Sequence, residues 1–570
     1  MKLRANIVFA VLAAATLVFG AEGLSHVVRA SRHAPPSSST GHADLQPETA
    51  IRRLLSEHGL NGGRIFLVTS GDKREANVER AARQAAAWVA MPTPVRHVPV
   101  ADIGDADAAL SPLFDDAANS SIATTGRFRE AGAAAGRRLW IANARPDAKD
   151  GAETTAASPA RELAGLAPLA AVCLAGGLAA GAAGAFASAL VFSLLLFLAL
   201  LPGMSAGPMS VWFLAALSAT VPWAFLRRRP GAQVQGLAWP VTAGAAVFAA
   251  TAAVALSHRL VTPYGLAVTG GKARLWLLAG GVPQGFFADD AAWGLLEPAY
   301  PPGCASLALG CYAAAGACGD WLTQLAPCLF AAASAAFLAS RTTGMAGRVW
   351  LLSLFLTPLA LMTPAQFYPE PILALGVLAG WERIRGGRAS GWLILGATGW
   401  FKNEGLLLLP AAWIAWRVSR GAARARLRDL AAALALPAAW HIGCRMAGAS
   451  LHDYAAPWRL SPMRGVRAIL AALRVAFARP WVHGFAYPAA LVAAVREWRR
   501  RELGKDGHAS MPPLHAALLF AALSFVFFGL AYACSTADEA WHLSTSLERL
   551  LLSPALVLAR ECVADGGRTR

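Results

Sequence analysis

Long apolar segments dominate the chain from Glu162 onward, and each is near or slightly below the roughly 20 residues that an α-helix needs to cross a bilayer. Over the 570 residues, 56% are hydrophobic and only 15% are charged. One soluble core could not hide so much apolar surface, and disordered, collagen-like and disulfide-stabilised proteins have other compositions. The sequence therefore predicts an all-α polytopic membrane protein with about 13–14 transmembrane helices.

The basic residues lie in short clusters between apolar segments, for example Arg227–Arg229 and Arg499–Arg501. A formal net charge of +17 could suggest nucleic acid, but clusters of this kind are typical of the cytoplasmic loops of polytopic proteins. We therefore expect membrane lipid, not nucleic acid, as a partner. The eight cysteines form no CxxC pair, so the sequence indicates neither a metal site nor a disulfide framework.

The first residues resemble an export signal. A basic start, Met1–Arg4, precedes the apolar segment Ile7–Gly20, so residues 1–29 are a signal anchor or a signal peptide. An uncleaved anchor is favoured because Ala21-Glu22-Gly23 makes a poor small-residue cleavage site. In both cases the residues that follow are expected outside the cytoplasm.

Residues 30–160 contain the only long polar stretch. After a linker rich in Pro and Ser, the pattern predicts strands at Arg64–Thr69, Val95–Val100 and Arg138–Ala142 and a helix at Lys73–Val89. We expect a small N-terminal exported α/β domain here. Its residues carry no glycine fingerprint and no metal-ligand spacing, so they indicate no activity.

The remaining chain divides into additional transmembrane helices at residues 161–236, a larger membrane domain at 237–559 and a polar C-terminal tail at 560–570. The clusters Arg383–Arg388 and Arg417–Arg428 both look cytoplasmic. About 28 residues separate them, too few for two full crossings at 1.5 Å per residue. Two short helices are therefore expected to meet at a polar break at Phe401–Gly405. Arg341 and Arg348 leave the number of crossings between Gly303 and Leu361 open.

Three groups of polar residues could carry chemistry. Lys402 and Glu404 lie at membrane depth, where ionisable groups are costly; the alternative is a structural turn in which they neutralise each other.

The second group lies in the loop His258–Pro302. Its cations Lys272 and Arg274 lie beside aromatic residues and suit a phosphate head group, although such loops also serve purely as membrane anchors. Its carboxylates Asp289, Asp290 and Glu297 could take a proton from a hydroxyl.

The third group follows the last clear apolar segment. His542, Ser546 and Arg549 recur at helical spacing. A nucleophilic serine with a histidine base is conceivable, but a polar helix face that closes over a cavity is favoured.

Four motifs follow one another in the order Gly271-Lys272-Ala273-Arg274 with Tyr300-Pro301-Pro302, Phe367-Tyr368-Pro369-Glu370-Pro371, Lys402-Asn403-Glu404-Gly405, and Trp541-His542-Leu543 with Ser546 and Arg549. This order resembles bacterial members of the multi-spanning C-type glycosyltransferase superfamily, which includes protein O-mannosyltransferases and the aminoarabinose transferases of lipid A. The resemblance covers roughly residues 237–559.

The resemblance implies that a sugar moves with inversion from a polyprenyl-phosphate carrier to an acceptor outside the bacterial inner membrane. No cofactor and no metal is implied. The substrate-binding residues that it implies are Lys272, Arg274, Tyr300, Tyr368, Glu370, Lys402, Asn403, Glu404, His542 and Arg549.

One feature departs from the resemblance. Relatives place an Asp early in the first outer loop, whereas this chain has Pro263-Tyr264-Gly265-Leu266 there and no Asp or Glu from His258 to Ala288. The catalytic base is therefore expected to be Asp289, Asp290 or Glu297. The alternatives are a catalytically inactive relative that binds polyprenyl-phosphate lipid and, with less support, a transporter, since only one broken helix and no matching partner is evident.

Overall fold

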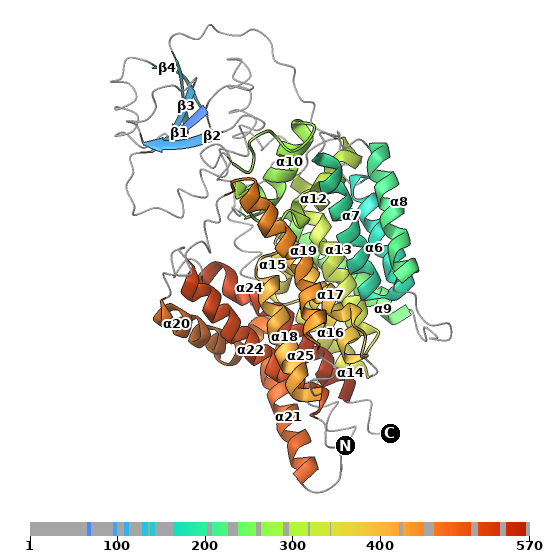
Figure 1. The fold of residues 1–570 in the computed structure, drawn as a ribbon. Coiled ribbons are helices and arrows are strands. Elements are labelled where there is room, and N and C mark those ends of the chain that lie inside the picture. Colours follow the sequence, from blue (N-terminus) through green and yellow to red (C-terminus); the bar gives the residue numbers. More distant parts are fainter. Residues whose placement is uncertain are drawn as a thin grey trace.

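The structure is a computed structural model, and it describes residues 65–69, 95–99, 108–112, 128–134, 137–142, 164–201, 208–225, 238–257, 264–288, 296–316, 320–342, 344–420, 426–449, 461–502, 511–535 and 543–565 (Figure 1). Several predictions fall outside these residues. They are the signal segment 1–29, the linker and the helix Lys73–Val89.

Five short strands form one sheet with the order β2-β1-β3-β5-β4. Their bounds are β1 (Ile65–Thr69), β2 (Val95–Pro99), β3 (Ala108–Pro112), β4 (Phe128–Ala134) and β5 (Arg137–Ala142). β1 is parallel to β2 and β3, whereas β5 is antiparallel to β3 and β4. The predicted strands correspond to β1, β2 and β5. β3 and β4 escaped prediction because their Ala- and Gly-rich sequences have low β-propensity.

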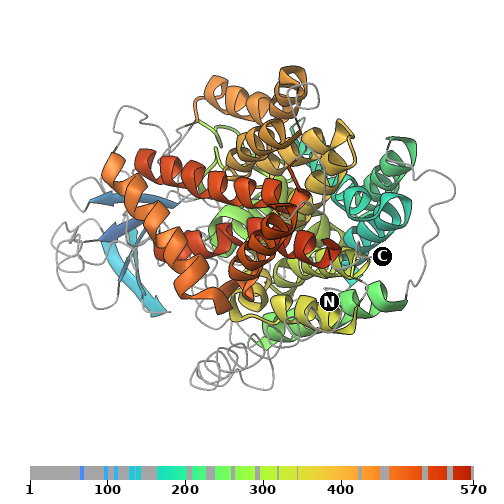
Figure 2. The same cartoon turned by 90° about the horizontal axis from the view of Figure 1, so that it is seen from below.

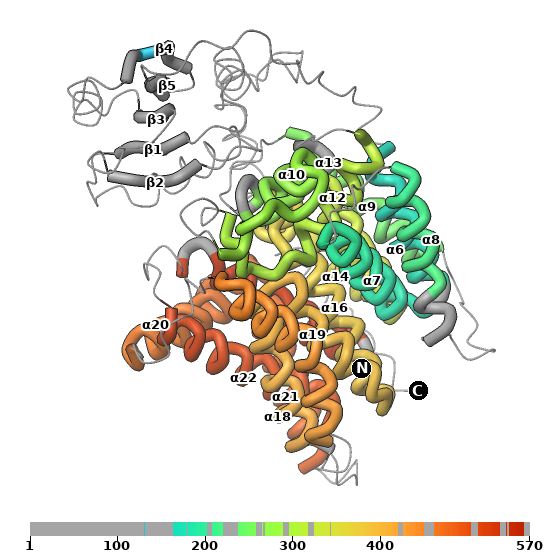
Figure 3. The backbone as a smooth tube through the Cα atoms, turned by 45° about the horizontal axis from the view of Figure 1, so that its top comes forward, coloured from blue at the N-terminus to red at the C-terminus, as the bar shows by residue number. Residues whose placement is uncertain are grey.

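Helices make up the rest of the described chain: α6 (Ala167–Ala180), α7 (Ala182–Leu200), α8 (Pro208–Phe225), α9 (Ala238–Ser257), α10 (Gly270–Leu278), α12 (Gly303–Ala315), α13 (Asp320–Ala339), α14 (Met345–Phe355), α15 (Pro358–Ala365), α16 (Glu370–Arg385), α17 (Ser390–Ala397), α18 (Gly405–Arg420), α19 (Leu427–Met446), α20 (Pro462–Leu473), α21 (Ala486–Glu502), α22 (Pro513–Cys534), α24 (Glu548–Leu550) and α25 (Leu552–Asp565). Short 3-10 or π turns join some of them: η3 (Tyr264–Thr269), η5 (Thr398–Trp400), η8 (Arg474–Ala478), η9 (Pro480–His483) and η10 (Leu543–Leu547). The teal helices α6 to α8 and the orange-to-red helices α20 to α22 lie on opposite sides of this helical body (Figures 2 and 3).

Several helices could span a membrane. Among the described residues, α7, α9 and α22 are long and apolar enough to cross alone, and α14 with α15 forms one further candidate bent by 49°. Five shorter apolar helices accompany them, at Ala167–Leu178, Pro208–Thr220, Gly303–Ala315, Gln324–Ala339 and Gly405–Ser419. The prediction of a helical membrane protein is thus supported at this coarse level, while the expected 13–14 full crossings remain a prediction.

The outer helices expose large apolar side chains, as a membrane requires. Leu198 of α7, Phe213 of α8 and Leu491 of α21 are 55%, 69% and 48% exposed. In water such surfaces would be unfavourable, but hydrocarbon chains solvate them at no cost.

α16 is the central helix of the body. Ile372 and Leu375 pack into the hydrophobic core that contains α6, α7 and α12, while Leu373 and Val377 pack into the core that contains α18, α22 and α25. A helix that is apolar on all sides is buried on all sides. The first residue of α16, Glu370, is thereby carried into the interior.

The predicted polar break between two short helices is present. α17 has eight residues and ends through η5, and α18 begins at Gly405 after the turn that contains Lys402 and Glu404. α18 then runs alongside α16 in the same direction: Lys402, just before α18, contacts Glu370 at the start of α16, and the rings of Trp381 and Trp416, near the ends of the two helices, lie 6.1 Å apart.

Glycine allows close packing around this break. A Cβ on Gly303 would lie 2.6 Å from the carbonyl oxygen of Trp400, so the start of α12 rests directly on the end of η5. A Cβ on Gly396 would lie 2.1 Å from the carbonyl oxygen of Ala433 on α19. Both distances are shorter than real Cβ contacts, so glycine is required at each position.

The C-terminal end of α16, opposite Glu370, carries a cluster of charged residues. Arg341 pairs with Glu382 at 2.9 Å, Arg385 pairs with Glu561 at 3.7 Å, and Arg560 contacts both acidic residues. Arg341 therefore shares an end of the body with Arg385, the relation that the sequence left open. α25 continues through Asp565 with Arg560 and Glu561 buried, beyond residue 560 where the polar tail was expected to begin.

Candidate functional site

Glu370 is the centre of a buried charged cluster. It begins α16 between Pro369 and Pro371, where proline suits the first turn because its missing N–H would have no partner there. Its side chain is fully buried. A carboxylate removed from water is strongly unfavourable unless cations or hydrogen-bond donors surround it.

Two cations converge on one oxygen of Glu370. Lys402 Nζ donates to Glu370 Oε1 at 2.7 Å, and Arg549 Nη1 lies 3.2 Å from the same oxygen. Lys402 comes from the break between α17 and α18, and Arg549 comes from α24. Both cations therefore face the same oxygen of Glu370.

The break supplies acceptor oxygens as well as a cation. Glu404 Oε1 lies 3.7 Å from Lys402 Nζ, and Glu404 is only 7% exposed. Its second oxygen, Oε2, and Oδ1 of Asn403 are buried and have no hydrogen-bond partner among the described residues. Buried acceptors of this kind call for a donor such as a hydroxyl group.

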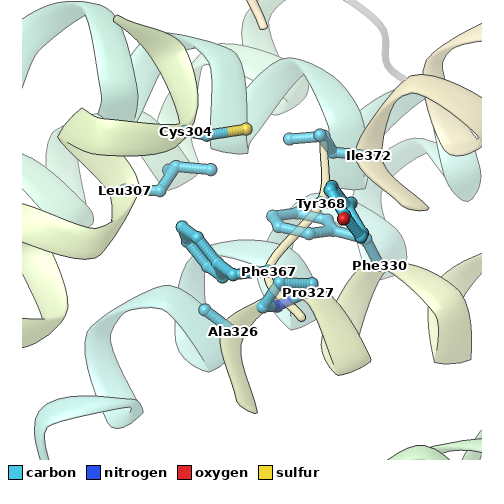
Figure 4. A pocket seen from close by; sticks show the side chains of 8 residues that line it. All are labelled: Cys304, Leu307, Ala326, Pro327, Phe330, Phe367, Tyr368 and Ile372. Carbon is cyan, nitrogen blue, oxygen red and sulfur yellow. The ribbon is translucent and has the colours of Figure 1, made fainter. Parts of the chain in front are cut away.

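Tyr368 joins the charged cluster to an apolar pocket. The guanidinium carbon of Arg549 lies 3.4 Å from the centre of the Tyr368 ring, a cation–π contact. The same ring lines a pocket with Phe330, Phe367 and Ile372, together with Cys304, Leu307, Ala326 and Pro327 (Figure 4). One side chain thus borders both a cation and a space lined almost entirely by apolar groups.

The loop before α12 meets the cluster through Tyr300. Lys272 of α10 is fully buried, and its Nζ donates to the backbone oxygen of Tyr300 at 2.9 Å and lies 5.9 Å from the ring centre. Tyr300 in turn interacts electrostatically with Arg549. Glu297 interacts electrostatically with Lys272 and has a left-handed backbone with φ of 50°. Arg274 is also buried, at 6% exposure.

On the side of α7, Trp400 next to the polar break takes part in a chain of hydrogen bonds. Trp400 Nε1 donates to Ser193 Oγ at 2.9 Å, and Ser193 Oγ donates to the backbone oxygen of Gly303 at 3.0 Å. Ser193 precedes the last residue of α7, Leu200, by about 10 Å along the helix axis. The polar break therefore lies within the length of a helix that could span a membrane.

Burial lowers the pKa of Lys272 from 10.5 to about 7, although the charge of Glu297 opposes the shift. Between these two values the unfolded chain binds a proton that the folded protein lacks, so the contribution of Lys272 to stability rises with pH from 7 to 10.5.

We expect the difference in free energy of unfolding between the wild type and Lys272→Met to shift by up to about 1.4 kcal/mol per pH unit across this range, in favour of the wild type as pH rises. Thermal unfolding of both proteins in detergent at a series of pH values measures this. Parallel curves for the two proteins would contradict it.

The structure brings most of the predicted site residues together. Lys272 and Tyr300 form one group, and Tyr368, Glu370, Lys402, Glu404 and Arg549 form the other, linked through Tyr300 and Arg549. Asp289, Asp290 and His542 lie outside the described residues.

Ser546 Oγ forms a 2.7 Å hydrogen bond with the hydroxyl of Tyr532 on α22. The sequence analysis did not identify Tyr532, because it lies inside an apolar segment and belongs to no polar motif. Phe367 belongs to one of the four motifs, but the sequence did not assign it to the site; it lines the pocket and has a positive φ of 52°.

Within the part of the chain that the structure describes, no three His, Cys, Asp or Glu side chains gather as a metal ligand set. Comparison of the chain with family models, with curated proteins and with solved structures finds no match.

Proposed function

We propose that this protein is a membrane glycosyltransferase that moves a sugar from a polyprenyl-phosphate carrier to an acceptor on the outer side of a bacterial inner membrane. The observation that carries the proposal is the position of Tyr368, which borders both Arg549 and an apolar pocket. Together, the cation and the apolar lining match in character the two parts of a substrate that has an anionic head and an apolar chain. The resemblance in motif order supports the same substrate class.

The cations would hold the phosphate of the carrier. Lys402 and Arg549 share a single carboxylate oxygen, so a phosphate oxygen can complete their coordination without displacing Glu370. Charge-assisted hydrogen bonds to phosphate are about twice as strong as neutral ones. They would grow stronger still as the bond between sugar and phosphate breaks and negative charge collects on the leaving group.

The acceptor oxygens would hold the sugar. Phosphate carries no donor for the free oxygens of Glu404 and Asn403, whereas sugar hydroxyls do. In the reaction, the acceptor hydroxyl attacks the anomeric carbon, the bond from that carbon to the phosphate oxygen breaks, and a carboxylate takes the hydroxyl proton. Asp289, Asp290 and Glu297 are the proposed bases.

In this proposal the protein crosses the membrane several times, and its N-terminal α/β domain lies outside the cytoplasm. The charge clusters support this orientation, since Arg341 and Arg385 share one end of α16 and Glu370 marks the other. The site would then face the outer leaflet.

A catalytically inactive relative that only binds polyprenyl phosphate is the second candidate. The observation that favours it is the lack of any Asp or Glu from His258 to Ala288. A transporter would instead move the lipid or sugar without cleaving it.

The decisive experiment supplies the purified protein in vesicles with decaprenyl-phosphate sugars and with a bacterial envelope extract as the source of acceptor, and it follows the release of free decaprenyl phosphate together with sugar incorporation into the extract. Release by the wild type and its loss in the triple variant Asp289→Asn, Asp290→Asn, Glu297→Gln are expected. Unchanged release in the variant would remove these carboxylates from the mechanism. Binding without release would favour the inactive relative, and movement of intact lipid between leaflets would favour the transporter.

A further inference from the structure

Arg549 lies at an irregularity in a nearly continuous helical segment. α24 has three residues, Glu548–Leu550; the π turn Leu543–Leu547 directly precedes it, and α25 follows it after Leu551. Regular α-helical hydrogen bonding is interrupted at such a place, so contacts from other segments help to fix the position of the guanidinium.

Three of these contacts come from one segment, Arg479–Tyr487, and they reach the chain on both sides of Arg549. The ring nitrogen Nε2 of His483 lies 2.8 Å from the carbonyl oxygen of Glu548, the residue before Arg549. The hydroxyl of Tyr487 donates to the carbonyl oxygen of Leu551, two residues after it, at 2.8 Å. Arg479 adds an ion pair with the carboxylate of Glu548.

The segment is itself fixed to the helical body. Two residues of the segment, Gly484 and Phe485, have left-handed backbone conformations, with φ of 56° and 62°. Trp350 of α14 donates its Nε1 to the carbonyl oxygen of Gly484 at 2.9 Å, and a Cβ on Gly484 would lie 2.4 Å from Leu354. A backbone held in this way is a rigid support.

The three contacts differ in their surroundings. The side chains of His483 and Tyr487 are each 2% exposed. The hydrogen bond of Tyr487 is buried, and that of His483 is partly buried. The side chains of Arg479 and Glu548 are 47% and 28% exposed, so their ion pair is screened and contributes less. The Tyr487 bond is therefore the most shielded of the three contacts.

We propose that His483 and Tyr487, assisted by Arg479, are positioning residues that hold the backbone around Arg549 so that its guanidinium reaches Glu370, Tyr368 and the phosphate of the lipid. The phosphate part rests on the proposed function. The part that concerns Glu370 rests on the contacts alone. None of these three residues belongs to the motifs that predicted the site.

Tyr487→Phe tests the proposal, since it deletes one hydroxyl and keeps the ring. We expect the affinity for decaprenyl phosphate in detergent micelles to fall about 5-fold, the effect of one hydrogen bond. In the Arg549→Ala background the same change should have no further effect, because the residue through which it acts is gone. The matched control is Tyr312→Phe, at a fully buried tyrosine of α12, which should leave the affinity unchanged.

A purely structural role for Tyr487 would instead weaken binding equally in both backgrounds, and that result would overturn the proposal. If Arg549→Ala alone leaves the affinity unchanged, the proposed lipid site is wrong. A second double-mutant cycle, with thermal stability as its measurement, still tests the positioning. Tyr487→Phe should lower the thermal midpoint by less in the Glu370→Gln background than in the wild type. An equal loss in both would refute the positioning of Arg549.

Discussion

Glu370→Gln is expected to lower the free energy of unfolding by about 3–5 kcal/mol, because it leaves two cations in the interior without their carboxylate. Lys402 and Arg549 both contact the same Glu370 oxygen, and Glu370 has no exposure to solvent. Reversible unfolding in mixed detergent micelles, followed by tryptophan fluorescence, measures the change.

The matched control is Glu497→Gln on α21. Glu497 contacts Arg501 at 3.9 Å in a partly exposed pair, so its loss should change stability by at most about 1 kcal/mol. The double variant Glu370→Gln with Lys402→Met should recover part of the stability, since one cation is removed and Arg549 is left with the carboxylate of Glu404. Equal stability of Glu370→Gln and Glu497→Gln would show that water or another group compensates the cations.

Arg549→Lys is expected to lower sugar transfer at least about 100-fold, even though it retains the positive charge. The guanidinium of Arg549 stacks on Tyr368 while one of its nitrogens contacts Glu370, a geometry that a flexible ammonium cannot reproduce. Initial rates with a decaprenyl-phosphate sugar, over a range of its concentration, separate the loss in kcat from the loss in apparent affinity.

The control for this change is Arg501→Lys, which alters a partly exposed pair near the end of α21. It should retain nearly the full rate. A loss of less than about tenfold in Arg549→Lys would mean that charge alone suffices, and Lys402 would then be the main phosphate ligand. A similar loss in both variants would point to a general requirement for arginine, not to the site.

Local patterns predicted much of the fold around the site. The spacing between two arginine clusters predicted short helices on either side of a polar break, and α17 and α18 have this arrangement. The pattern failed where the segments are less regular. Hydropathy does not show where a proline divides an apolar segment into two helices, as at the 49° bend between α14 and α15.

The candidate site was predictable as a set of residues but not as a geometry. The sequence drew attention to Lys402, Glu404 and Arg549 because charged groups are costly between apolar segments. It assigned Glu370 the role of a substrate ligand through resemblance, whereas the contacts make it the shared partner of two cations. His483 and Tyr487 carried no signal, since their partners are backbone carbonyls.

By itself, then, the sequence determined the apolar helices and the position of the polar break, because hydropathy and helix length are properties of neighbouring residues. Only the tertiary structure decided that Lys402 and Arg549 meet at one oxygen of Glu370 and that Arg341 shares an end with Arg385. These pairs join residues far apart in the chain. Which charges meet depends on how whole helices pack, and packing is fixed by the shapes of side chains on all helices at once.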